Sequence, residues 1–193
     1  MTRMARPRQF DEERAVDAAM RAFWIAGYEA TSTQALCEAT GLGRSSIYNT
    51  FTSKHDLFER ALRRYMTAKN ATTFDLLDGD LDAKAKMRAL LWQVVDAPEA
   101  DPLGCLVVNS MVELAPHDPE VAATLREDQR RRLAALRDAL ESGRRAGEID
   151  NSKSADELAH FMNATIAGMR VAARGGASRD ALAAIAGTAL DAF

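Results

Sequence analysis

Cysteine is scarce in this chain: Cys37 and Cys105 are the two among 193 residues, and they lie far apart. Such usage fits a reducing compartment better than a disulfide scaffold. No apolar run approaches the ~18 residues of a membrane span. The chain starts with a basic segment, but no apolar segment follows it, which argues against a secretory signal peptide. We therefore expect a cytoplasmic protein with no membrane partner.

Recognisable catalytic motifs are also missing. The three histidines, His55, His117 and His160, have no nucleophile or paired acid in a known arrangement, and neither common type of glycine-rich phosphate loop occurs. Asn109, Glu113 and His117 are spaced by four and could gather as ligand contacts or metal ligands. Because Pro116 interrupts the helix and Cys and His are sparse, a polar helix edge is the better interpretation. The sequence predicts neither an enzyme nor a bound metal or cofactor.

A net charge of −3 does not by itself indicate a nucleic-acid binder, but the charge is distributed unevenly along the chain. Residues 1–67 carry ten Lys and Arg against eight Asp and Glu, whereas the remainder carries fifteen against twenty. Arg3, Arg6 and Arg8 can form a basic arm that lies along phosphates or enters a minor groove. The acidic remainder argues against an architectural protein that coats DNA and favours binding to one site of defined geometry.

Apolar residues recur at helical spacing along the chain, so we expect an all-α protein. In the first helix, Val16, Met20, Phe23 and Gly27 follow the rhythm of an inward face. Glycine, proline and aspartate separate the later helices. We expect these at about residues 54–77, 81–96, 103–115, 119–146, 154–174 and 178–192.

Residues 31–51 have the pattern of a helix, a glycine turn and a second helix. Ser32 can cap the first helix, and Gly41 can end it because glycine adopts a left-handed backbone without steric cost. On the second helix, Ile47 and Phe51 share an inner face, which leaves polar side chains outward. These are Arg44, Ser45, Ser46, Tyr48 and Asn49. Arginine and asparagine can each bind a base through two hydrogen bonds, and hydroxyls bind phosphate or base edges, so the segment predicts DNA binding.

The following helix begins with Ser53 as a candidate cap and Asp56 three residues later, as in a capping box. Lys54 opposes the helix dipole there, a placement that costs ~0.3–1 kcal/mol. A DNA phosphate that meets Lys54 and the free amides of the helix start would offset this cost. Next to the helix-turn-helix pattern we therefore prefer a phosphate contact to a solvated lysine.

Taken together, residues 10 to about 64 resemble the DNA-binding domain of the TetR family of bacterial transcription regulators. The matching pieces are Phe23-Trp-Ile-Ala-Gly27-Tyr28, Ala30-Thr31-Ser32, Gly41-Leu42-Gly43-Arg44, Ile47-Tyr48-Asn49-Thr50-Phe51, Ser53-Lys54 and Leu57-Phe58. Gly-Tyr before the motif and Tyr-x-x-Phe-x-Ser-Lys after it make the match specific. Two positions depart from the pattern: Gly43 stands where a capping serine is usual, and Thr50 where an aromatic residue is frequent.

The resemblance implies a helix-turn-helix DNA-binding domain at residues 1–64, with its motif at about 32–51, and a helical effector-binding and dimerisation domain at 65–193. It implies phosphate contacts by Ser32 and Thr33, and clamping of the DNA backbone by Tyr48 and Lys54. Arg44, Ser45, Ser46 and Asn49 are expected to face the major groove. The implied function is that of a repressor released from its operator by a small molecule.

The last two expected helices, about 154–192, are rich in Ala and Gly, which lets helices pack closely. Two such helices from each subunit can form a four-helix interface, the dimer that the resemblance also implies. A two-fold dimer presents two recognition helices at roughly 34–36 Å. We therefore expect a homodimer on a pseudo-palindromic double-stranded operator.

The control signal is the least defined part of the sequence. Apolar residues of the middle helices can line an effector cavity or form plain core. The candidates are Met66, Met87, Leu91, Trp92, Cys105, Val108, Asn109, Met111, Val112 and Phe161. Cys105 offers an alternative control mode, a thiol sensor of oxidants or electrophiles, against the reading of a buried, inert cysteine.

Overall fold

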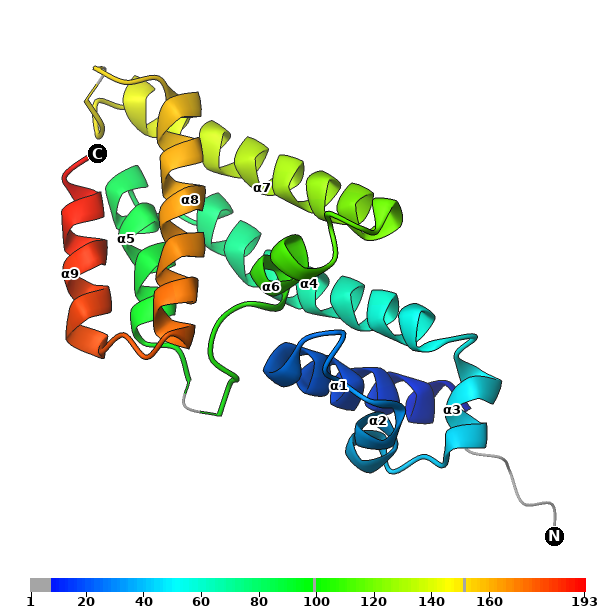
Figure 1. The fold of residues 1–193 in the computed structure, drawn as a ribbon. Helices are drawn as coiled ribbons and strands as arrows, with labels where there is room; N and C mark the ends of the chain where they lie inside the picture. Colours follow the sequence, from blue (N-terminus) through cyan, green and yellow to red (C-terminus); the bar gives the residue numbers. More distant parts are fainter. Residues whose placement is uncertain (1–7, 99, 151) are drawn as a thin grey trace, which may run out of the picture.

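The computed structural model describes residues 8–98, 100–150 and 152–193, with the side chains from residue 12 onward. Within these residues the chain forms nine α-helices and no strand, which confirms the all-α prediction (Figure 1). The helices are α1 Arg8–Ala26, α2 Thr33–Thr40, α3 Arg44–Thr50, α4 Lys54–Asp78, α5 Ala83–Val95, α6 Leu106–Glu113, α7 Pro119–Arg145, α8 Ala155–Arg174 and α9 Arg179–Leu190.

The predicted helix-turn-helix forms as α2 and α3. The Ser32 hydroxyl accepts a hydrogen bond from the Ala35 N–H at 3.1 Å, and so caps α2. Gly41 has φ 70° and donates its N–H to the Cys37 carbonyl, as expected for a left-handed helix end. Leu42 is half-buried between the two helices and packs against the hydrophobic cluster beneath them.

The start of α4 differs slightly from the predicted capping box. The Ser53 hydroxyl accepts from the Asp56 N–H at 3.0 Å, as expected. The Asp56 carboxylate, however, accepts from the Thr52 N–H at 3.0 Å and also binds the Arg60 guanidinium. Arg60 and the amide of Thr52 hold the pKa of Asp56 below its usual value, with the hydrogen bond from Arg60 as the main cause. The C-terminal end of the motif is thereby fixed to the start of α4.

Two hydrophobic clusters hold the molecule together, and residues of α4 belong to both of them. In Figure 1, α4 extends from the helices of the motif toward α5 and α7. The head cluster joins α1, α2, α3 and the first part of α4 with α6 and the start of α7. The body cluster joins Leu77 of α4 with α5, the end of α7, α8 and α9. The boundary expected after residue 64 therefore falls inside one continuous helix, roughly 37 Å long at 1.5 Å per residue.

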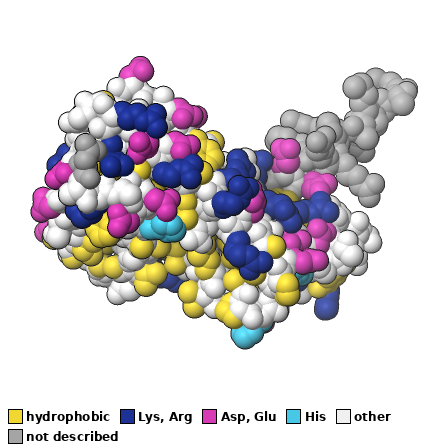
Figure 2. Space-filling view, turned by 90° about the horizontal axis from the view of Figure 1, so that it is seen from above, with side chains coloured by type: hydrophobic (Ala, Val, Ile, Leu, Met, Phe, Trp, Pro, Cys, Tyr) yellow, Lys and Arg dark blue, Asp and Glu magenta, His cyan; other side chains and the backbone are white. Residues whose placement is uncertain are grey.

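The surface carries charges of both signs in mixture. Figure 2 shows Lys and Arg interspersed with Asp and Glu over much of one face, with hydrophobic side chains gathered along the lower edge of its left half. Over the part of the chain that the structure describes, every helix is too short or too polar to cross a membrane.

Candidate DNA-binding face and regulatory pocket

Helix α3 presents a polar outer face. Ile47 and Phe51 are 1% and 0% exposed and anchor the inner face in the head cluster. Arg44, Ser45, Ser46 and Asn49 are all exposed. Within the described residues, none of these four side chains makes a hydrogen bond or ion pair; the Arg44 guanidinium lies 5.9 Å from the centre of the Tyr48 ring. Their donors and acceptors are therefore free for a partner.

Phosphate-binding candidates flank this face. The Thr33 hydroxyl at the start of α2 lies 3.1 Å from the Tyr48 hydroxyl of α3, so the structure brings these two predicted residues together. Lys54 Nζ, at the start of α4, lies 4.4 Å from the centre of the Tyr28 ring and 3.5 Å from the Glu29 carbonyl. The predicted basic arm falls outside this description: Arg3 and Arg6 precede the described residues, and the side chain of Arg8 is not among those described.

Glu113, at the end of α6, connects this helix to the turn before the motif. Its carboxylate accepts hydrogen bonds from the backbone N–H groups of Tyr28 at 3.0 Å and Glu29 at 2.8 Å. Gly27 lies directly against this carboxylate: a Cβ there would come within 2.9 Å of Glu113 Oε2, and its φ is +86°. From the sequence, Glu113 was expected to lie on a polar helix edge. Its partners are 84 and 85 residues away, so no local signal could have found them.

Two further contacts join segments that are distant in the sequence. His55 Nε2 of α4 lies 2.6 Å from Asp118 Oδ2, whose carboxylate also caps α7 by accepting from the N–H groups of Glu120 and Val121. The hydrogen bond from Val121, supported by His55, holds the pKa of Asp118 below its usual value. The guanidinium at the end of α8, Arg174, donates to three backbone carbonyls at 3.1–3.4 Å, those of Trp24, Ile25 and Leu103.

A small cavity of about 60 Å³ lies between α6, α7 and α8. Its lining is Cys105, Val107, Val108, Met111, Gln129, Arg132, Asn163, Ile166, Ala167 and Arg170. The Tyr65 hydroxyl lies 3.5 Å from Cys105 Sγ and donates to it; burial, with Cys105 as a lesser cause, raises the pKa of Tyr65. Three predicted lining residues, Cys105, Val108 and Met111, are present here.

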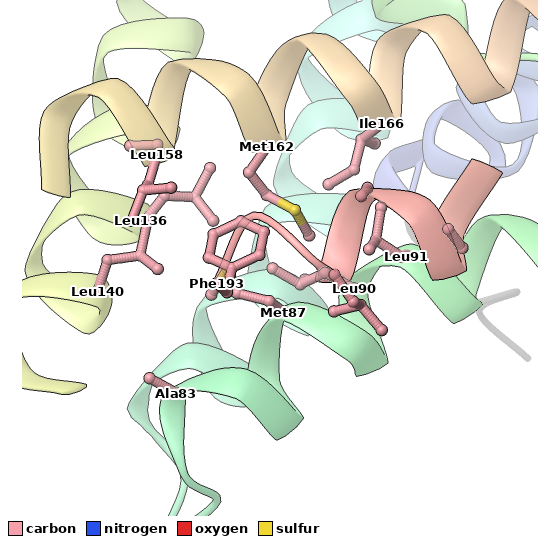
Figure 3. Close-up of a cluster of buried hydrophobic side chains, with 14 of the residues drawn as sticks. Ala83, Met87, Leu90, Leu91, Leu136, Leu140, Leu158, Met162, Ile166 and Phe193 are labelled. Atoms are coloured by element: carbon pink, nitrogen blue, oxygen red, sulfur yellow. The ribbon is translucent and has the colours of Figure 1, made fainter. Parts of the chain in front are cut away.

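The structure does not bring the other predicted pocket residues to this cavity. Met87 and Leu91 are fully buried in the body cluster, where they point toward α8 and α9 (Figure 3), and Trp92 packs against the same cluster. Met66 is buried in the head cluster. Val112 is 75% exposed, and Phe161 is 42% exposed on another surface. Asn109 neighbours the lining residue Val108 along α6 and has a buried, unpartnered Nδ2.

The sequence does not reveal the direction in which a buried side chain points. An apolar stripe does not tell which helix it will face, and Met87 and Leu91 face α8 and α9 (Figure 3). The sequence analysis did not predict the four polar lining residues, because polar side chains on such helices are usually solvated. Gln129 and Arg132 belong to the charge-laced α7, and Asn163 and Arg170 to the small-residue-rich α8, so they had the pattern of solvated positions.

An apolar surface lies across α8 and α9. Phe161, Thr165, Ala184, Ile185, Thr188 and Ala189 line an open hollow of about 420 Å³. Phe161 and Ile185 are each about two-fifths exposed. This hollow belongs to the helix pair predicted to form the dimer interface.

Comparison with known proteins identifies the family. The model of the N-terminal domain of bacterial regulatory proteins of the tetR family matches residues 15–61, and a tetracyclin repressor-like C-terminal domain matches residues 83–188. The chain belongs to the TetR family. It is 35% identical over 189 residues to the HTH-type transcriptional repressor ComR of Escherichia coli K12, covering 96% of this chain and 90% of ComR.

Further similar proteins support the same assignment. The chain is 28% identical over 117 residues to the repressor BdcR of Escherichia coli K12, covering 60% of this chain and 58% of BdcR. The TetR family regulator CifR, solved as a cysteine mutant complexed with 26-base-pair operator DNA, superposes with a TM-score of 0.86 at 31% identity, covering 98% of this chain and 100% of CifR. The predicted family and fold are confirmed: this chain is a TetR-type DNA-binding transcriptional repressor rather than an enzyme.

The described residues offer no site for a metal within this TetR-type fold. Among them, no three side chains of His, Cys, Asp or Glu lie close enough together to hold an ion. The candidate functional sites are the outer face of α3 with its flanks, the α8–α9 surface, and the cavity between α6, α7 and α8.

Proposed function

We propose that this repressor acts as a homodimer that binds a pseudo-palindromic operator with two copies of α3 and leaves it when a small molecule occupies the cavity between α6, α7 and α8. The observation that carries the proposal is the outer face of α3. Its four polar side chains are exposed and uncommitted, while Ile47 and Phe51 hold the helix rigidly in the head.

We infer the DNA contacts from the exposed face of α3 and the residues that flank it. Arg44, Ser45, Ser46 and Asn49 enter the major groove, where Arg44 suits guanine and Asn49 suits adenine. Ser32, Thr33, Tyr48 and Lys54 contact the phosphates on either side and set the register of the helix. CifR, with 31% identity, was solved in complex with operator DNA, which supports the same mode for this chain.

Dimerisation uses α8 and α9. Their exposed face includes Phe161 and Ile185, large apolar side chains that a monomer leaves in water. A second copy packed against the same face buries them in an isologous four-helix interface. Two copies of α3 can then reach successive major grooves, and each half-site adds its discrimination.

Release by an effector is supported by the position of α6. This eight-residue helix forms one wall of the cavity and ends at Glu113, which holds the amides of Tyr28 and Glu29 before α2. A ligand that enlarges the cavity displaces α6 and changes the orientation of the motif. A few kcal/mol of preference for the displaced state is enough to empty the operator.

The test begins with genomic DNA. Sequencing the fragments that the purified protein retains should yield a pseudo-palindrome, and a gel shift on that site should give one discrete complex of a dimer. Compounds are then screened for release of this complex. Equal retention of random and genomic DNA, or a discrete complex with one subunit, contradicts the proposal.

A second control mode rests on the placement of Cys105. Its sulfur lines the cavity next to the Tyr65 hydroxyl, so an electrophile that enters can add to the sulfur while the thiol proton leaves to solvent. Cys105→Ser should then abolish release by electrophiles but keep operator binding, whereas Cys37→Ser should change neither. Unchanged release by the Cys105→Ser protein excludes this mode.

A further inference from the structure

We propose that the cavity between α6, α7 and α8 selects ligands with a carboxylate group, whose oxygens are bound by Arg132 and Arg170. This inference deepens the proposed function and rests on it in one respect, since the same cavity is the one through which release would act.

The charge of the lining carries the argument. Two guanidinium side chains, one from α7 and one from α8, line a cavity of about 60 Å³, and among the described residues no carboxylate lines it. Within the described residues, neither Arg132 nor Arg170 forms an ion pair within 4.0 Å or a side-chain hydrogen bond. Two cations held near each other in a small space create a strong preference for an anion.

The nearest acid along α7 is already engaged. Asp128 precedes Arg132 by one helical turn, is 6% exposed, and accepts a hydrogen bond from Asn70 Nδ2 at 2.6 Å. Its second oxygen is buried and has no hydrogen-bond partner among the residues that the structure describes. Even if Asp128 offsets one positive charge, the second guanidinium remains uncompensated. The local balance therefore still favours an anionic ligand.

An unmet hydrogen bond points the same way. The Nε atom of Arg132 is buried and has no hydrogen-bond partner in the described part of the chain. Buried donors of charged groups are nearly always paired in folded proteins, and leaving one unpaired is costly. A carboxylate oxygen would satisfy this donor, and the planar guanidinium matches a carboxylate in a two-pronged arrangement.

The rest of the lining describes the remainder of the ligand. Val107, Val108, Met111 and Ile166 supply an apolar wall, and Gln129 and Asn163 supply amide groups. The volume equals about two water molecules at roughly 30 Å³ each, which is enough for the carboxylate group alone. An attached apolar chain must therefore push against the wall that α6 forms. We infer a short-chain or compact organic acid.

Calorimetric titration of the full-length protein with butyrate and its uncharged isostere butyramide tests the assignment. Butyrate should bind at least about tenfold more tightly than butyramide. Arg132→Gln and Arg170→Gln should each lower butyrate affinity at least about tenfold and leave butyramide unchanged. Arg130→Gln is the matched control, because Arg130 lies two residues away on α7 but is exposed and pairs with Glu127; it should change affinity less than about twofold.

Equal binding of butyrate and butyramide by the wild-type protein, or full butyrate affinity in both variants, overturns the inference. Inorganic phosphate that binds as tightly as butyrate also overturns it, because the site would then accept a bare oxyanion. If a glutamine variant fails to fold, Arg132→Lys and Arg170→Lys replace it, because lysine keeps the positive charge. The comparison of butyrate with butyramide on the wild-type protein still tests whether the cavity selects a carboxylate. If neutral compounds release the operator and butyrate does not bind, the carboxylate inference is wrong and the proposed release mechanism still holds. If butyrate binds but does not release the operator, the proposed release mechanism is wrong and the carboxylate inference still holds.

Discussion

The carboxylate of Glu113 accepts a hydrogen bond from the backbone N–H of Tyr28 at 3.0 Å, across 85 residues of chain. The N–H of Glu29 binds the other carboxylate oxygen at 2.8 Å. Because Tyr28 and Glu29 form the turn that leads into α2, this one side chain ties the position of α6 to that of the helix-turn-helix. A substitution at Glu113 breaks this contact and leaves the residues proposed to face DNA unchanged.

Glu113→Ala should lower the free energy of unfolding by about 1–3 kcal/mol, because the partly buried amide of Tyr28 and the exposed amide of Glu29 lose a charged acceptor. We also expect a weaker response of operator binding to any effector, since α6 no longer holds the turn. Urea unfolding and gel shifts measure the two effects. Glu127→Ala, which removes an exposed carboxylate of α7, is the control and should change neither.

Gly27→Ala tests the same contact from the other side. The added Cβ would lie 2.9 Å from Glu113 Oε2, and an alanine at φ +86° carries a further cost of about 1–2 kcal/mol. In a double-mutant cycle, Gly27→Ala should destabilise the Glu113→Ala protein less than the wild type, because the clash is gone. Equal costs in both backgrounds would show that the carboxylate does not press on this turn.

Asp118→Asn should reduce the sensitivity of folding to acid. The pKa of Asp118 is lowered in the folded state, so its contribution to stability is present above about pH 4, the range of an unfolded aspartate, and is lost as the pH falls through the lowered value. Asparagine keeps the capping of α7 but does not titrate. Unfolding free energies between pH 7 and pH 3 should therefore fall less steeply in the variant, and parallel curves would refute this.

Arg44→Ala and Lys54→Ala should affect DNA binding in different ways. Loss of Arg44 should cost about 1–3 kcal/mol per half-site and relax the choice of one base pair. Loss of Lys54 should weaken specific and random DNA alike and lower the salt dependence by about one phosphate contact. Binding titrations at several salt concentrations separate the two. An equal loss for Arg44→Ala on both kinds of DNA contradicts its place in the major groove.

Ile185→Asp should convert the protein to a monomer and lower operator affinity at least about tenfold. The change places a charge on the apolar α8–α9 surface, where a second copy would have to bury it without a partner. Analytical ultracentrifugation reports the assembly state directly. Leu81→Asp, at another large and exposed apolar side chain, should remain dimeric. A dimer that persists in Ile185→Asp moves the interface elsewhere.

The sequence predicted best what is encoded locally. Ser32, Gly41 and Ser53 each act within four residues of their own position, so the helix ends were recognisable from residue types alone. Contacts across the fold were not recognisable in this way. Arg132 and Glu113 both have the pattern of solvated helix positions, and only the packing of α6 against α1, α7 and α8 gives them inward roles.

The sharing of one hydrophobic cluster between the head and α6 limits how this repressor can be re-engineered. A fragment cut after residue 64 would leave Phe58, Leu62 and their neighbours without the cover that Leu106, Val107 and Leu125 provide, and would tend to aggregate. A hybrid that grafts a foreign sensor onto this motif must therefore also transplant α6 and the beginning of α7, or recreate their apolar side chains.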